Sequence, residues 1–220
     1  MSRNPLPASH PYAPIPLGST PEAGRAVAWD PGRDPHFLVA SLAGRSTSSV
    51  TALITETLLT RGLSVDVIDP KRQTRTTVLD EARLHTEPET ITAAAKAFHT
   101  DMLAAFDADS VHIARRRFLV VENTYALTAE LPDVLRLVRE VSLLGWATGH
   151  HLVLAYPART LPGLSDVAIE EFARLALTGN LLDDHRPLAA ATGARPIRGW
   201  LEAATGTVPL TLDPATPQAH

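Results

Sequence analysis

Short apolar runs alternate with longer amphipathic stretches from residue 25 onward, and this alternation limits the folds open to the chain. The apolar runs lie at residues 36–41, 63–69, 118–121 and 152–156, and stretches with apolar residues at helical spacing follow each of the first three. Short apolar runs of this length are typical of buried strands. Strands that alternate with helices predict an α/β fold, in which helices cover both faces of a largely parallel sheet.

Composition and the placement of prolines divide the chain into one domain and two short tails. The 220 residues include 45% hydrophobic and 20% charged types, as is usual for a single folded domain. We expect a proline-rich arm at residues 1–16, the domain at 17–213 and a disordered tail at 214–220. Within the domain, residues 165–177 are predicted to form a further helix. A small C-terminal β-hairpin is predicted from 196–201 and 208–212, around Gly206.

Several classes of function are excluded or disfavoured by residue content. The absence of cysteine rules out disulfides and thiol chemistry. No apolar run approaches the roughly 20 residues of a membrane span, and residues 1–16 lack the apolar core of a signal peptide, so we expect a cytoplasmic protein. The adjacent His150 and His151 point to opposite faces of a strand and are poorly placed to share a metal ion.

The net charge of −4 gives the chain no overall basic field, so any contact with DNA would need a local patch. The densest basic run consists of Arg115, Arg116 and Arg117. These side chains are candidates for contacts with DNA phosphate. A solvated turn before a strand is the alternative interpretation.

The loop after the first predicted core strand, residues 41–48, reads S-L-A-G-R-S-T-S. A strand, a small-residue loop and a helix can direct backbone N–H groups at a phosphate. In the phosphate-binding motif GxxxxGK[ST], glycines wrap the phosphates, lysine reaches the β and γ oxygens and a hydroxyl holds Mg²⁺. Here Ser41 and Ser46 stand at the glycines and Thr47 at the lysine, while Ser48 keeps the hydroxyl. On these residues alone, an ordinary strand-loop-helix corner remains open.

Four longer segments add to this loop: PLGSTPEAGRAVAWDPGRDPHFLVAS, ALITETLLTRGLSVDVIDPKR, RFLVVEN and LLGWATGHHLVLAYPAR. Their order over residues 16–212 resembles the FtsK/SpoIIIE family of P-loop DNA translocases, within the HerA/FtsK superfamily. The resemblance implies a three-layer αβα RecA-like P-loop NTPase fold. Members of that family assemble as hexameric rings around duplex DNA, and the resemblance implies a place for this chain in or beside such a ring.

The chain departs from the family pattern at the positions that carry the chemistry. Thr47 replaces the lysine, and Glu122 and Asn123 stand where the family has Asp and Glu. Trp146 replaces an arginine, and Tyr156 and Pro157 replace a threonine and a glutamine. The resemblance therefore implies a vestigial nucleotide site with no catalytic residue, made up of Gly44, Arg45, Ser46, Thr47, Ser48, Ser49, Glu122, Asn123 and Pro157. Ser48 and Glu122 would hold a metal only if Mg-nucleotide still binds.

These departures indicate a degenerate P-loop domain, or pseudo-ATPase, without a cofactor unless ATP and Mg²⁺ still bind. We expect an accessory, regulatory or scaffold subunit of a DNA-translocation or DNA-handling system. Its partners would be further copies of itself or an active FtsK-like homologue, with double-stranded DNA left open. Two alternatives stay open. One is an active ATP-dependent DNA translocase in which Arg45, or a residue of a neighbouring subunit, supplies the missing charge. The other is a protein-interaction module that binds neither nucleotide nor DNA.

Overall fold

The computed structural model describes residues 13–41, 47–72, 83–107, 116–157, 172–178, 197–204 and 206–212. These residues form a ten-stranded sheet in the order β2-β1-β10-β9-β8-β3-β7-β6-β4-β5. Six neighbouring strands are parallel, as the alternating pattern predicted. They are β8 (Phe172–Thr178), β3 (His36–Ser41), β7 (His150–Pro157), β6 (Arg117–Val121), β4 (Ser64–Ile68) and β5 (Leu84–His85).

Four antiparallel strands extend the parallel region beyond β8. They are β9 (Ile197–Ala203), β10 (Gly206–Leu212), β1 (Ile15–Ser19) and β2 (Ala26–Trp29). β9 and β10 form the predicted C-terminal hairpin, and Gly206 at its turn has a φ of 111°, which glycine tolerates and other residues rarely adopt. β1 begins at Ile15, inside the segment predicted to be an arm, and Ile15 is almost fully buried.

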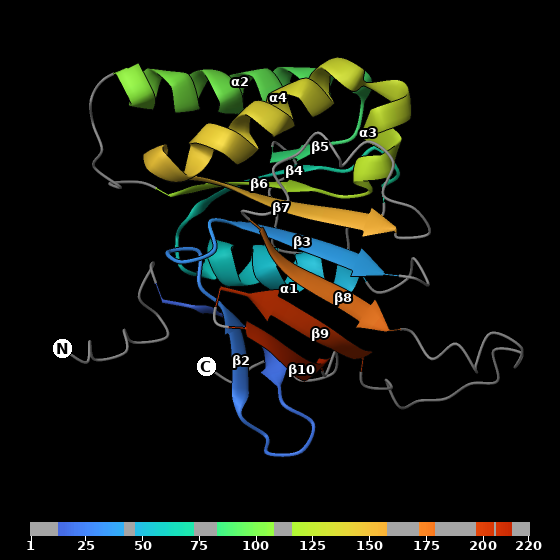
Figure 1. Ribbon diagram of the computed structural model, residues 1–220. Helices are drawn as coiled ribbons and strands as arrows, with labels where there is room; N and C mark the ends of the chain where they lie inside the picture. The colour runs from blue at the N-terminus through green and yellow to red at the C-terminus, as the bar shows by residue number, and fades with distance from the viewer. Residues whose placement is uncertain are drawn as a thin grey trace, which may run out of the picture.

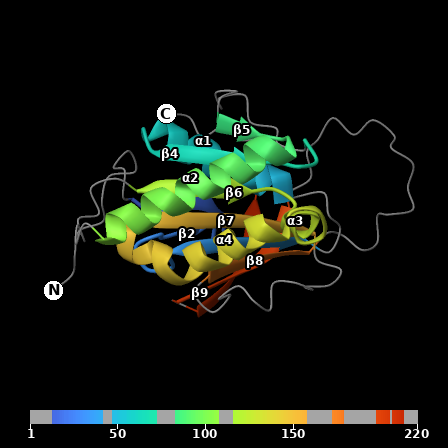
Figure 2. The same cartoon turned by 90° about the horizontal axis from the view of Figure 1, so that it is seen from above.

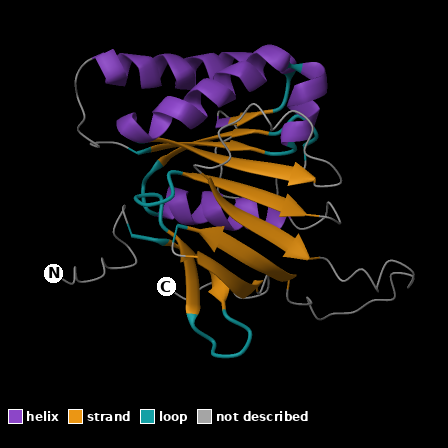
Figure 3. Cartoon of the chain, in the orientation of Figure 1, coloured by secondary structure: helices purple, strands orange, loops and turns teal. Residues whose placement is uncertain are grey.

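Helices cover both faces of the sheet, which makes the three layers visible in Figures 1 and 2. α1 (Thr47–Thr60) packs on one face through Val50, Ile54 and Leu58. The other face carries α2 (Pro88–Asp107), α3 (Thr124–Glu130) and α4 (Pro132–Leu144), and α4 continues into the 3-10 helix η2 (Gly145–Thr148). The predicted three-layer α/β fold is thus confirmed, and Figure 3 shows its helical and sheet layers apart.

One predicted helix is wrong. Residues 172–177 of the segment 165–177 belong to strand β8, while residues 165–171 lie outside the described part of the chain. β8 is paired on both sides, with β3 in parallel and β9 in antiparallel orientation. Both of its faces carry buried residues, since Phe172 packs in the core under α2 and α4, and Ala173 and Leu175 pack in the core under α1. A short apolar run of that kind has no period that separates strand from helix.

The connections place the carboxyl ends of the parallel strands together. β3 leads through residues 42–46 to α1 on one face, whereas β6 leads to α3 and α4 on the opposite face. In open α/β sheets, ligands bind at such a point, where successive connections leave toward opposite faces. Among the described helices, none is long and apolar enough to cross a membrane.

Candidate functional site

The candidate site lies at the carboxyl edge of the sheet and includes the first turn of α1. Thr47 begins this helix and is buried, and Ser48 and Ser49 follow it in half-buried positions. Gly44, Arg45 and Ser46 lie outside the described residues. The start of α1 thus presents hydroxyl groups on a helix that directly follows β3, as the loop pattern predicted.

Glu122 lies beside α1 and contacts it directly. It follows β6, is 2% exposed, and is anchored by its backbone N–H to the Ile68 carbonyl at 2.8 Å. The Thr51 hydroxyl donates a hydrogen bond to Glu122 Oε1, and Ser48 Oγ lies 3.5 Å from Oε2. The sequence analysis overlooked Thr51, although its place one helical turn after Thr47 puts both on one side of α1.

A second carboxyl group lies close to Glu122. Asp69 follows β4, the neighbour of β6, and is fully buried. Burial raises the pKa of Glu122 to about 7; the hydrogen bond from Thr51 opposes this rise, and the charge of Asp69 adds to it. Glu122 is therefore divided between its neutral and ionised forms at neutral pH, whereas a carboxylate that binds Mg²⁺ must be ionised.

Asn123 has a conformational role that the sequence comparison did not suggest. Its φ of 53° and ψ of 56° lie in the left-handed region, and it caps the amino end of α3 without a side-chain hydrogen bond to the helix. Asparagine is among the few residues other than glycine that adopt this conformation readily. Its amide also cannot accept a proton from water as a carboxylate does.

Pro157 ends β7 beside the start of the loop, since Ser41 and Pro157 are paired in the parallel ladder of β3 and β7. The structure therefore brings Pro157 to the same edge as Thr47 and Glu122. Trp146 lies elsewhere: it belongs to η2, before the other end of β7. An eight-residue strand is roughly 25 Å long, so Trp146 is remote from this edge.

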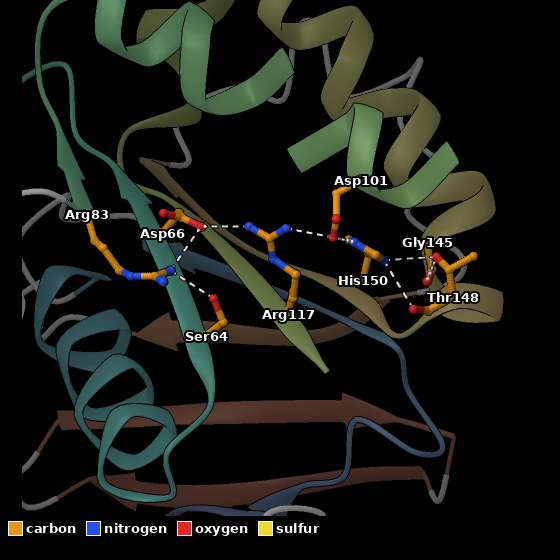
Figure 4. A network of polar contacts seen from close by, with 8 residues as sticks. All are labelled: Ser64, Asp66, Arg83, Asp101, Arg117, Gly145, Thr148 and His150. Atoms are coloured by element: carbon orange, nitrogen blue, oxygen red, sulfur yellow. Dashed lines mark hydrogen bonds and ion pairs between the residues drawn. The ribbon is translucent and has the colours of Figure 1, made fainter. Parts of the chain in front are cut away.

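Of the basic run Arg115–Arg117, Arg117 takes part in a network of polar contacts within the chain (Figure 4). Arg117 is half-buried; one guanidinium nitrogen lies 2.6 Å from Asp101 Oδ2 and another 3.5 Å from Asp66 Oδ2. The same network continues from Asp101 to His150 Nε2 at 3.0 Å. A contact of Arg117 with DNA would have to compete with two carboxylates. Arg116 is half-buried, Arg115 lies outside the described residues, and their contact with DNA stays a prediction.

Basic residues after β4 are also paired within the chain. Lys71 Nζ lies 2.6 Å from Glu130 Oε1, and Arg72 forms an ion pair with Glu87. Among the described residues at this edge, the groups nearest the first turn of α1 are hydroxyls and carboxyls. Ser48 and Glu122 match the oxygen ligands that Mg²⁺ prefers. The described residues fit a triphosphate poorly, because Thr47 supplies no positive charge and Glu122 and Asp69 add negative charge.

No protein-family model matches the sequence, and no curated protein sequence matches it either. Solved structures do share the fold. The cytoplasmic domain of the type VII secretion ATPase EccC from Thermomonospora curvata aligns with a TM-score of 0.68 and 22% identity, over 96% of this chain and 28% of that chain. The cytoplasmic domain of EssC aligns with a TM-score of 0.67 and 16% identity, over 96% and 47% of the two chains.

A third structure of this fold is the conjugation coupling protein TcpA of pCW3, in a monomer form with ATPγS. It aligns with a TM-score of 0.64 and 16% identity, over 90% of this chain and 65% of that chain. The chain thus spans less than half the length of EccC and EssC. The similarity confirms the predicted three-layer α/β fold, which this chain shares with these ATPases.

Proposed function

We propose that the chain is a non-hydrolysing domain with a P-loop ATPase fold, which serves as an accessory, regulatory or scaffold subunit beside an active ATPase of related fold. The observation that carries the proposal is the internal pairing of Glu122 with α1. Its carboxyl group is bound by Thr51 and faces Ser48, in a buried position beside Asp69. These contacts engage both carboxylate oxygens of Glu122 within the chain.

The electrostatics of this arrangement oppose catalysis. A working site needs positive charge against the β and γ phosphates and a carboxylate that orients the attacking water. Thr47 supplies a neutral hydroxyl in place of the first, and Asn123 a neutral amide in place of the second. The left-handed backbone of Asn123 further suits a capping role rather than a catalytic one.

The neighbouring structures suggest the setting in which such a subunit works. EccC is an ATPase of type VII secretion, and TcpA is a conjugation coupling protein. We place this chain in the cytoplasm beside an active ATPase of that kind, in a secretion or DNA-transfer system. Assembly with further copies of itself belongs to the same proposal.

The test is an ATPase assay on the purified chain with Mg²⁺ and duplex DNA, with and without the candidate partner ATPase. We expect no turnover above background by the chain alone. A rate in the range of roughly 1 to 1000 s⁻¹ that is usual for enzymes would overturn the proposal. The active-translocase alternative makes a distinct prediction: turnover would be present and would be lost in Arg45→Ala.

A further inference from the structure

Five large apolar side chains are exposed where α2 and α4 end, and together they form what we call the α2–α4 patch. Their exposed fractions range from 40 to 62%. The patch consists of Leu103 and Phe106 of α2, Leu143 and Leu144 of α4, and Trp146 of η2.

The position of these residues relative to a contact between the two helices places them on one side of the helix pair. α2 and α4 lie side by side over the same face of the sheet and end on the same side of the molecule (Figures 1 and 2). His99 Nε2 of α2 lies 2.6 Å from Glu140 Oε2 of α4, which sets the two helices in register. One turn beyond this pair come Leu103 and Leu144, and Phe106 and Trp146 follow.

The gathering of these side chains distinguishes the patch from scattered surface residues. Single exposed apolar residues are ordinary, whereas contiguous apolar surface marks sites of interaction. Among the described residues, the other large exposed apolar side chains are Tyr125 and Trp200, which belong to α3 and β9. α2 and α4 run in the same general direction, and side chains on such a helix pair can pack against a further helix.

The charges beside the patch indicate what kind of helix would fit. Neither α2 nor α4 has a basic residue in its last turn, so the partial negative charge of both carboxyl ends is not offset there. Asp107, exposed, adds a full negative charge next to Phe106. The basic residues of α4, Arg136 and Arg139, lie one to two turns earlier, and Arg136 is paired with Glu140.

We propose that the α2–α4 patch binds an amphipathic helix of a partner protein, with the apolar stripe of that helix over the patch and its lysine or arginine side chains next to Asp107 and the helix ends. Recognition would follow the helix-in-groove mode, with anchors at i, i+3, i+4 and i+7. The proposal is independent of nucleotide binding, because the patch lies at the opposite edge of the sheet from Glu122.

The experiment uses the full chain with Trp200→Phe, so that Trp146 is the exposed fluorescent reporter; the remaining tryptophan, Trp29, is 1% exposed. The probes are a synthetic Leu/Lys amphipathic helical peptide and a Leu/Glu peptide with the same apolar pattern. We expect the Leu/Lys peptide to shift the Trp146 emission to the blue and to bind at least tenfold more tightly than the Leu/Glu peptide. Phe106→Ser should weaken its binding at least tenfold.

Tyr125→Ser is the matched control, because Tyr125 is about as exposed as Phe106 but belongs to α3. It should leave the affinity unchanged. Equal affinity for the two peptides, or binding that withstands Phe106→Ser, would overturn the proposal. So would a free chain in which Trp146 already emits as a buried indole, since the chain would then cover its own patch. A dimer that dissociates on Phe106→Ser would assign the patch to a second copy instead.

Discussion

Thr47 is the residue at which the fold and its usual chemistry separate most clearly. It begins α1 and is buried beside the loop that follows β3, where a lysine would face the phosphates. The structure otherwise describes two features typical of a phosphate site here: the amino end of α1 and the hydroxyl group of Ser48.

Thr47→Lys should strengthen nucleotide binding. A charge-assisted hydrogen bond contributes about 1.5 to 3 kcal/mol, which corresponds to roughly a ten- to hundredfold gain in affinity. Calorimetric titration with ATP and Mg²⁺ measures this gain, and Thr47→Met is the control of similar length without charge. Hydrolysis should stay absent, because Asn123 still replaces the carboxylate. A folded Thr47→Lys variant that binds ATP no better than the control would contradict the assignment of residues 41–48.

Glu122→Gln should change the pH dependence of folding stability. The folded-state pKa of Glu122, about 7, lies above its usual value of 4.5, so ionisation costs stability as the pH rises through this interval. Glutamine carries no such cost; its carbonyl oxygen can accept the hydrogen bond from Thr51, and its amide can donate one to Ser48 Oγ. Relative to the native chain, the variant should gain about 3 kcal/mol between pH 4.5 and pH 7.5.

Urea denaturation at the two pH values measures this difference. Glu130→Gln provides the control, since Glu130 is exposed and its pair with Lys71 lies at the surface. A difference between the native chain and Glu122→Gln that is the same at both pH values would show that Glu122 is not held in a buried, proton-binding site.

At the scale of elements, the antiparallel strands contribute buried side chains to the core under α1. β1 and β2 bring Ile15, Leu17 and Trp29 into the core cluster that includes the buried face of α1. β1 joins β10 and so connects the amino-terminal part of the domain to its carboxyl-terminal hairpin. This contact depends on close approach of the two backbones at Gly18.

Gly18→Ala should loosen the junction of β1 and β10. A Cβ atom at Gly18 would lie 2.3 Å from the Thr211 carbonyl oxygen, and backbone of a paired strand cannot easily move aside. We expect a loss of about 1 to 3 kcal/mol in the free energy of unfolding, measured by denaturant titration. Ser19→Ala, which adds no atom at the next position of β1, should cost much less. Equal stability of Gly18→Ala and the native chain would show that β1 does not dock on β10.

At the scale of the whole molecule, buried histidines link stability to pH. His36, on β3, and His151, on β7, are buried at the amino ends of neighbouring strands. Burial lowers the pKa of His36 to about 4, and that of His151 to about 3, against the usual 6.5. His36 Nδ1 accepts the Leu152 N–H at 3.0 Å, which requires the neutral form of His36. His151 Nδ1 donates to the Pro35 carbonyl at 2.7 Å, a bond that opposes the effect of burial without overcoming it.

The domain should therefore lose stability as the pH falls from about 6.5 to about 4. Over this range the two histidines bind protons in the unfolded chain but stay neutral in the folded chain, so the free energy of unfolding rises with pH. Glu122 has the opposite effect as the pH rises toward 7, which places the maximum near neutral pH. Thermal melts from pH 4 to pH 8 measure the curve. The double variant His36→Gln, His151→Gln should flatten its acidic limb; an unchanged limb would contradict the assignment.

The sequence determined the central part of the fold because that part depends on local periodicity. The predicted strand 36–41 has the observed bounds of β3, and the predicted bounds of β4, β6, β7 and the hairpin at Gly206 agree within a few residues. Helices follow β3 and β6, as the helical spacing predicts. Buried parallel strands are continuous apolar runs, and amphipathic helices repeat every three to four residues, so both are visible in one dimension. The gathering of Thr47, Ser48, Glu122 and Pro157 at one edge follows from the same order of strands and helices.

Tertiary structure alone decided the features that depend on contacts between distant segments. β8 is a strand because β3 and β9 pair with it on both sides, although its own residues were read as a helix. Thr51 belongs to the site because Glu122 reaches it from 71 positions away. Arg117 is bound by Asp66 and Asp101, and Trp146 joins a patch from two helices. Pairing, burial and charge of this kind are set by which surfaces meet in space, and no local pattern records them.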